Sequence, residues 1–205
     1  MYIAEWCTNE KRSFLRHRIE TRQADLLFRL ERYNDALELL KRLLHEIKKL
    51  DDKALQVEIQ LIESQVFHAL ENIPKSKASL TAVKTASHSI YVAPQTQACV
   101  DMMSGVISAE ENDYITAYSY FYESFEGYNS LSDPLAEKAL KYMCLSKIMN
   151  KQSDDALNVI NSQISLKYQG VELESMREVA KAAKAQNLLL FEKCKNSYEK
   201  GRLIV

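Results

Sequence analysis

Hydrophobic positions recur along the whole chain at the spacing of helical turns. In one clear case Leu37, Leu40, Leu44 and Ile47 share a face, while lysine and arginine side chains occupy the opposite face. Apolar residues three and four positions apart predict amphipathic α-helices, and the alternation typical of half-buried strands is missing. We therefore expect an all-α protein.

The pattern divides the chain into about ten helices. We expect them over residues 12–32, 33–50, 51–72, 74–90, 94–112 and 113–131, and then around residues 139–148, 156–160, 173–183 and 190–198, with a break over 165–170. In the first helix we expect Leu15, Ile19, Leu26 and Leu30, with Phe14 and Leu27 beside them, to form the buried stripe. Asp133-Pro134 and Ser153-Asp154-Asp155 are interpreted as helix caps.

A bulky residue followed three positions later by a small one recurs with a period near forty, and only the fourth pair has a weak first member. The steps between successive pairs are 40, 41, 39 and 38 residues. Such a period predicts stacked helical hairpins, each covering the apolar face of its neighbour, and we place the small residues Ala36, Ser76, Ala117 and Ala156 where two helices cross closely. Gly105 is a further candidate for a close crossing. The pairs are Tyr33/Ala36, Ile73/Ser76, Tyr114/Ala117, Ser153/Ala156 and Phe191/Cys194.

Composition narrows the function classes. The chain has 205 residues, only four glycines and three prolines, and a net charge of −1. This balance gives no indication of binding to nucleic acid or to an anionic membrane, both of which favour a basic excess. No signal peptide or apolar run of membrane-spanning length is expected, and the four scattered cysteines form no C-x-x-C pair. We expect reduced thiols and a location in the cytoplasm and nucleus.

Candidate chemistry is sparse. The four histidines, His17, His45, His68 and His88, fall in four predicted helices and form no zinc-binding pair. No serine lies in a nucleophile motif, and the few glycines form neither a phosphate-binding loop nor a dinucleotide fingerprint. We therefore expect no enzymatic activity, no cofactor, no metal and no catalytic residue.

Two groups of residues are candidate partner contacts. The basic cluster Lys11, Arg12, Arg16, Arg18 and Arg22 could meet an acidic partner, although a solvated helix face also accounts for it. In the aromatic segment 118–122, Tyr118 and Phe121 fall on the apolar stripe, whereas Tyr120 and Tyr122 point off it and could anchor a partner. A neighbouring repeat covering these two tyrosines is the alternative.

The segment at residues 117–149 also carries a resemblance to a known family. Its sequence is AYSYFYESFEGYNSLSDPLAEKALKYMCLSKIM, and it resembles the aromatic helical hairpin of the proteasome lid subunits of the PCI family. Residues 5–22, 48–70, 74–91 and 97–114 are similar to consecutive stretches of the same family in the same order. The similarity weakens after residue 150 and persists to about residue 198.

This resemblance implies a right-handed α-solenoid of tetratricopeptide-like (TPR-like) hairpins, about five in number, forming a single domain over residues 1–205. It implies a non-catalytic scaffold of the proteasome regulatory particle that stabilises the association of lid, ATPase ring and core particle in ubiquitin-dependent degradation. The expected partners are other lid subunits together with ATPase-ring and core-particle subunits. The winged-helix module of PCI proteins, which pairs lid subunits, is expected to be absent.

Two alternatives remain open at this stage. Subunit 2 of the COP9 signalosome shares the aromatic hairpin, although the stretch at residues 51–60, DDKALQVEIQ, is more similar to the proteasome form. A general helical-repeat adaptor that captures a client peptide in its concave groove is also compatible with the fold.

Overall fold

The computed structural model describes residues 6–7, 10, 12–162, 165–168 and 170–202. Every regular element that it describes is helical, which confirms the all-α prediction. The elements are α2 (Ser13–Arg29), α3 (Tyr33–Leu50), α4 (Lys53–Ala69), α5 (Ile73–Ser87), α6 (Pro94–Glu110), α7 (Tyr114–Ser130), α8 (Leu135–Met149), α9 (Ser153–Ile160), the short 3-10 helix η1 (Ser165–Tyr168), α10 (Val171–Lys184) and α11 (Leu188–Arg202).

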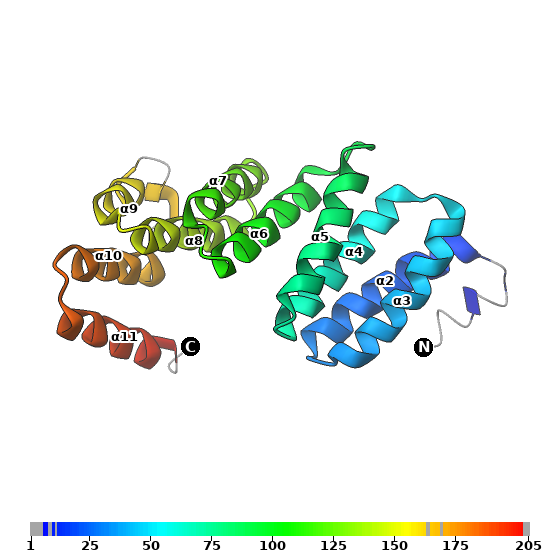
Figure 1. The fold of residues 1–205 in the computed structure, drawn as a ribbon, viewed down its shortest axis with the longest axis horizontal. Helices are drawn as coiled ribbons and strands as arrows, with labels where there is room; N and C mark the ends of the chain where they lie inside the picture. The colour runs from blue at the N-terminus through cyan, green and yellow to red at the C-terminus, as the bar shows by residue number, and fades with distance from the viewer. Residues whose placement is uncertain (1–5, 8–9, 11, 163–164, 169, 203–205) are drawn as a thin grey trace. The chain divides into compact units, whose positions relative to one another are not determined.

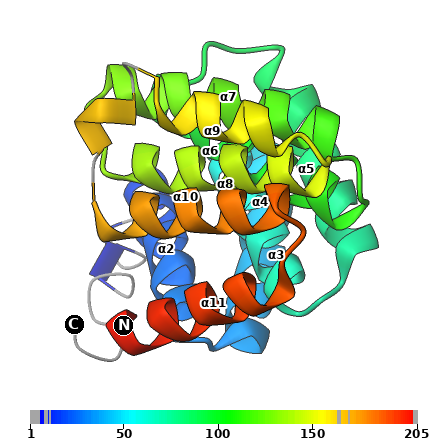
Figure 2. The ribbon, with the colours of Figure 1, turned by 90° about the vertical axis from the view of Figure 1, so that its left-hand side faces the viewer.

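The helices fall into two compact units, residues Met1–Thr96 and Gln97–Val205. In the first unit, α2 packs on α3, α3 on α4 and α4 on α5, so that the four helices lie side by side (Figure 1). In the second unit, α8 lies beside α7, α9 and α10, and α10 continues to α11 (Figure 2). Each unit is thus a stack of antiparallel helices; a single continuous domain over residues 1–205 stays a prediction.

One turn geometry joins the two helices of each described hairpin. Its central residue is left-handed, with φ between 49° and 63°. In the second hairpin, the Glu71 N–H donates to the His68 carbonyl and the Asn72 N–H donates to the Phe67 carbonyl, both at 2.9 Å. This pair of bonds is the Schellman arrangement, which satisfies the free carbonyls of the first helix. It recurs within the expected five hairpins, with the left-handed residues Glu31, Glu71, Asn112, Lys151 and Gln186, and it occurs again at Ser132 between α7 and α8.

Small residues recur in pairs in the first four hairpins, one on each helix of a hairpin. Each small residue that the repeat predicted has a small counterpart twelve positions earlier, on the preceding helix. All eight are buried, and they allow the two helices of a hairpin to approach closely. The predicted close crossing is confirmed for Ser76, whose hydroxyl and carbonyl both bond to Ser64. The corresponding buried pairs in the other hairpins are Ala24/Ala36, Gly105/Ala117 and Cys144/Ala156.

The third hairpin shows why the first member of such a pair is small. A Cβ atom at Gly105 would lie 2.5 Å from the Cε1 atom of Phe121 on α7. The Ser124 hydroxyl, also on α7, donates a 2.9 Å hydrogen bond to the Ala98 carbonyl on α6. The close crossing expected at Gly105 is thus present, and the Phe121 ring occupies the space of the missing side chain.

The fifth pair of the sequence repeat, Phe191/Cys194, is out of register with the fifth hairpin. The turn residue is Gln186 and α11 begins at Leu188, so the position of the small residue falls on Phe191, whose backbone N–H bonds to the Asn187 carbonyl at 3.2 Å. A phenylalanine cannot fit a crossing built for alanine, and Phe191 is accordingly 43% exposed. Phe191 is therefore not buried at this position, unlike the small residues of the other four hairpins.

The buried stripe predicted for α2 is also wrong. Phe14, Leu15, Leu26 and Leu30 are between 41% and 68% exposed, and the buried side chains are His17, Glu20, Thr21 and Ala24. Ala24 is required on the inner face because it opposes Ala36. The polar residues beside it are tolerated because α3 supplies partners: Glu46 accepts from His17 at 2.9 Å, and Arg42 donates to Glu20 at 3.1 Å.

Two of the predicted caps differ in detail. Asp133 does accept a hydrogen bond, from the Leu135 N–H at 2.9 Å, but Pro134 is the N-cap rather than the first helical residue of α8. The N-cap of α9 is Gln152, with no side-chain cap, so the expected capping by Ser153-Asp154-Asp155 is wrong. Because Asp154 and Asp155 lie in the first turn, they favour the helix through its dipole instead.

Aromatic side chains form the centre of the second unit. Phe121, Phe125 and Tyr128 of α7 are each 2% exposed. The Phe121 ring stacks on Tyr142 of α8 with centroids 5.2 Å apart, and Phe125 meets Tyr168 of η1 edge to face at 5.8 Å. One face of α7 is therefore fixed by the core, and its opposite face is available to solvent.

Candidate partner-binding surfaces

The two arginines predicted to contact a partner lie in different environments. Arg12 is exposed at the start of α2, and its guanidinium lies 5.7 Å from the centroid of the Trp6 ring. Arg16 is 23% exposed and pairs with Glu46 of α3, the same carboxylate that His17 contacts. The hydrogen bond from His17, followed by the charge of Arg16, lowers the pKa of Glu46. Arg16 therefore joins α2 to α3, and Arg12 is left on the surface.

The rest of the basic cluster is split in the same way. Arg18 and Arg22 are exposed on α2, and the Arg18 guanidinium lies 4.8 Å from the centroid of the Phe14 ring. Lys11 lies outside the described residues. The described arginines other than Arg16 are thus compatible with the solvated helix face that the sequence left open.

The two tyrosines predicted to contact a partner also differ. Tyr120 is half-buried, whereas Tyr122 is 39% exposed. A hydrogen bond with Glu126, one turn later on α7, raises the pKa of Tyr122, so its hydroxyl stays protonated at neutral pH. Tyr118 is half-buried, with the Lys147 ammonium 4.5 Å from its ring centroid. Tyr122 is the tyrosine in this segment best placed to meet another molecule.

Tyr122 belongs to a continuous exposed face of its helix, which we name the α7 stripe. Its members, at helical spacing, are Ile115, Ser119, Tyr122 and Glu126, with Glu123 beside them, and all are exposed. Ile115 is 68% exposed, a high value for a large aliphatic side chain. The stripe thus combines apolar surface with two carboxylates on a helix anchored by its other face.

The segment of sequence that carries the α7 stripe is acidic. Eight of the 28 acidic residues and none of the 27 basic ones fall within residues 97–137, a formal charge of −8 in a chain whose total is −1. Sequence reasoning singled out Tyr122 but missed Ile115, Glu123 and Glu126. The absence of lysine and arginine from residues 97–137 was the available indication in the sequence, although it does not show which carboxylates face solvent.

Histidines and cysteines form no reactive cluster in the described part of the chain. His17 is buried against Glu46, His45 and His88 are exposed, and His68 is half-buried. No group of three histidine, cysteine or acidic residues capable of holding a metal ion occurs among the described residues. The four cysteines are not joined in disulfide bonds, and burial raises the pKa of Cys144 to about 12, so this thiol is unreactive.

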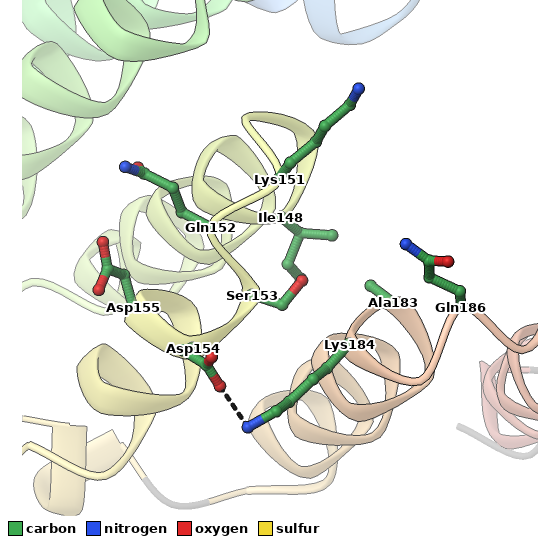
Figure 3. Close-up of a pocket in the computed structure, with 9 residues that line it drawn as sticks. All are labelled: Ile148, Lys151, Gln152, Ser153, Asp154, Asp155, Ala183, Lys184 and Gln186. Carbon is green, nitrogen blue, oxygen red and sulfur yellow. Dashed lines mark ion pairs between the residues drawn. The ribbon is translucent and has the colours of Figure 1, made fainter.

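A polar pocket lies between the turn after α8 and the end of α10 (Figure 3). Its charges are balanced: Lys184 pairs with Asp154 at 2.5 Å, and Lys147 beside the pocket pairs with Asp155 at 3.5 Å. Ser153 has no histidine near it among the described lining residues, so nothing there would activate it. The described lining is Ile148, Lys151, Gln152, Ser153, Asp154, Asp155, Ala183, Lys184 and Gln186.

Of the helices that the structure describes, none has both the length and the apolar character needed to cross a lipid bilayer.

Comparison with solved structures places the fold among TPR-like repeats. Two crystal structures of nearly identical TPR-like repeats from a Podosopora anserina kinesin light chain, one of them a point variant, superpose with a TM-score of 0.71. Each match covers 91% of this chain and 96% of the other, at 12% and 13% sequence identity. At such low identity the likeness shows the fold alone, an α-solenoid of helical hairpins.

Comparison with curated proteins gives much higher identity, although no family model matches the chain. The chain is 48% identical over 197 residues to the 26S proteasome non-ATPase regulatory subunit 11 homolog of Arabidopsis thaliana, covering 96% of this chain and 47% of that protein. It is 48% identical over 189 residues to subunit 11 of Dictyostelium discoideum, covering 92% and 46% respectively. It is 46% identical over 201 residues to the 26S proteasome regulatory subunit RPN6 of Saccharomyces cerevisiae, covering 96% and 46%.

The chain spans about half the length of these curated relatives. Its identity to them extends through both units and therefore well beyond the aromatic hairpin that carries the resemblance. Over nearly its whole length, this chain is a homologue of the 26S proteasome non-ATPase regulatory subunit 11 proteins.

Proposed function

We propose that this chain is a non-catalytic structural scaffold in the lid of the proteasome regulatory particle. The observation that carries the proposal is the identity of 42–48% to subunit 11 proteins from plant, slime mould, fission yeast and budding yeast. Its contribution is to stabilise the association of lid, ATPase ring and core particle during ubiquitin-dependent degradation. The partners are other lid subunits, ATPase-ring subunits and core-particle subunits, in the cytoplasm and nucleus.

The physical character of the chain supports a scaffold. A stack of helical hairpins exposes an extended surface, and its stability depends only on contacts between neighbours, so the surface can vary without loss of fold. Such repeats bind through surface side chains rather than through a reactive centre. The charge-balanced pocket and the separated histidines of the described residues offer no arrangement of nucleophile and base.

Affinity purification from cells tests the proposal. A tagged version of the chain is expected to recover lid, ATPase-ring or core-particle subunits of the proteasome, identified by mass spectrometry. Tyr91→Ala serves as a folded control, because this side chain is 89% exposed and lies outside the aromatic hairpin of residues 117–149. Recovery of signalosome subunits would support the COP9 alternative, and recovery of unrelated client proteins alone would support a peptide-binding adaptor.

The absence of catalysis is tested separately. We expect the purified chain to show no peptidase, deubiquitinase or ATPase turnover above buffer. Turnover that persists through further purification and is lost on a point substitution would contradict the scaffold proposal.

A further inference from the structure

We propose that the α7 stripe is a docking surface for a partner helix that interleaves aliphatic residues with lysine and arginine. The inference deepens the proposed scaffold role, on which it rests, by naming the chemistry of one partner. It concerns the stripe defined above: Ile115, Ser119, Tyr122 and Glu126, with Glu123 beside them.

The apolar part of the stripe requires an apolar counterpart. Ile115 is 68% exposed and Tyr122 is 39% exposed, seven positions apart on one helix. Seven residues are two helical turns, about 10.5 Å along the axis, which matches the separation of anchor residues on an amphipathic partner helix. Large apolar side chains exposed at this spacing gain free energy when a partner removes them from water.

The anchoring of α7 makes the stripe a rigid surface. The opposite face of the helix carries Phe121, Phe125 and Tyr128, each 2% exposed in the core of the second unit. Because little flexibility is lost when a rigid surface binds, the stripe is pre-organised for recognition.

The charge of the stripe selects a basic partner. Glu123 and Glu126 form no ion pair in the described structure, and residues 97–137 contain no lysine or arginine. A lysine or arginine entering the stripe would meet both carboxylates and the exposed face of the Tyr122 ring, which also attracts cations. The same charges repel nucleic acid and acidic proteins.

A second copy of this chain is the competing occupant. Leu26 of its α2 and Leu30, the C-cap of that helix, are 57% and 68% exposed, and α2 also carries the exposed Arg22 and Arg29. Arg29 is already paired with Asp25 at 3.0 Å, which reduces the basic charge that α2 offers to the carboxylates of the α7 stripe. We therefore favour a helix from a different protein.

Peptide binding by the purified chain tests the inference. The probe is a fluorescent amphipathic helix of leucine and lysine, about 14 residues or four turns long. Two peptides of equal length serve as comparators: one replaces lysine by glutamate, and the other replaces leucine by serine. The variants are Ile115→Ala/Tyr122→Ala and Glu123→Gln/Glu126→Gln, and the matched control is Glu38→Gln/Glu58→Gln, which removes two exposed carboxylates from the first unit.

We expect the leucine and lysine peptide to bind, and each α7 variant to raise its Kd by about tenfold. The control should stay within about twofold, and both comparator peptides should bind at least about tenfold more weakly. Circular dichroism and an unchanged Tm verify that the variants are folded. Equal weakening by the control, or equal binding of the serine and lysine peptide, would show simple charge attraction and overturn the inference.

Sedimentation of the purified chain alone tests whether a second copy of this chain occupies the α7 stripe. Concentration-dependent self-association that the α7 variants abolish would assign the stripe to another molecule of this chain and contradict the inference. A monomer at all concentrations supports it. Because these measurements use only the purified chain, a failure to recover proteasome subunits from cells would contradict the proposed function without affecting them.

Discussion

Ser64 of α4 and Ser76 of α5 exchange hydrogen bonds across the second hairpin. The Ser64 hydroxyl donates to the Ser76 carbonyl at 2.9 Å, and the Ser76 hydroxyl donates to the Ser64 carbonyl at 2.8 Å. The two hydroxyl oxygens are 3.1 Å apart, and both residues are fully buried. The helices can approach this closely because neither side chain extends beyond its oxygen. The same position holds the alanine pair Ala24 and Ala36 in the first hairpin.

This relationship predicts non-additive stability changes. Ser64→Ala should lower the free energy of unfolding by about 1 kcal/mol, because one buried hydrogen bond is lost and the Ser76 hydroxyl loses a neighbour. The double variant Ser64→Ala/Ser76→Ala should cost less than the sum of the two single variants, since it recreates the alanine pair of the first hairpin. Urea denaturation of all four proteins measures the coupling. Strict additivity would show that the two hydroxyls act independently.

The third hairpin predicts a steric penalty at its glycine. Gly105→Ala should destabilise the chain by about 1–3 kcal/mol, even though alanine is the better helix former, because the new methyl group would lie 2.5 Å from Phe121. In the Phe121→Leu background, where the side chain is smaller, Gly105→Ala should cost less stability than it does in the wild type. Thermal unfolding measures both. A Gly105→Ala protein that melts at a higher temperature than wild type would contradict the close crossing.

The sequence predicted the hairpin crossings because their cause is periodic. Ala36, Ser76, Ala117 and Ala156 each lie three positions into a second helix, so the steric demand for a small residue recurs with the repeat. The sequence pattern placed the fifth pair at Phe191 and Cys194, because nothing in the polar residues Gln186 and Asn187 distinguishes a turn from the surrounding helix. The position of the fifth hairpin's turn is shown by the left-handed backbone at Gln186, which is a property of the folded chain.

The faces of α2 and α7 show a second limit of sequence reasoning. Hydrophobic spacing identifies a helix, but Leu26 and Leu30 are exposed because Ala24 must face Ala36. On α7, the sequence separated Tyr122 from the buried Phe121 correctly, because the aromatic stripe is long and regular. The sequence did not show that Ile115 and Glu126 share one exposed face, since an exposed apolar residue and an exposed carboxylate follow no common pattern of composition.

The left-handed turn residues predict a gain from glycine. Lys151 has φ of 60°, a conformation that a side chain disfavours by roughly 1–2 kcal/mol and that glycine adopts freely. Lys151→Gly should therefore stabilise the chain, by about 0.5–1 kcal/mol after the greater freedom of glycine in the unfolded state is included. Lys151→Val should destabilise it, because a β-branched side chain is strained there. Tm values of the two variants that shift in the same direction would contradict this account.

The environment of Glu46 predicts a loss of stability in acid. The hydrogen bond from His17 and the charge of Arg16 lower the pKa of Glu46 below its ordinary value of 4.5. A carboxyl group with a lowered pKa in the folded state stabilises the fold at pH above 4.5, and the contribution disappears as pH falls through the folded-state value. The free energy of unfolding of the wild type should therefore decrease more steeply below about pH 4.5 than that of Glu46→Gln, which has no proton to bind. Parallel pH profiles would show that the contacts of Glu46 do not depend on its charge.

The fifth hairpin predicts that two phenylalanines will respond very differently to truncation. Phe121 is 2% exposed and stacks on Tyr142, so Phe121→Ala should cost about 3–5 kcal/mol. Phe191 occupies the position of the small crossing residue but is 43% exposed, so Phe191→Ala should cost about 1 kcal/mol or less. A loss for Phe191→Ala comparable to that for Phe121→Ala would show that Phe191 is a core residue.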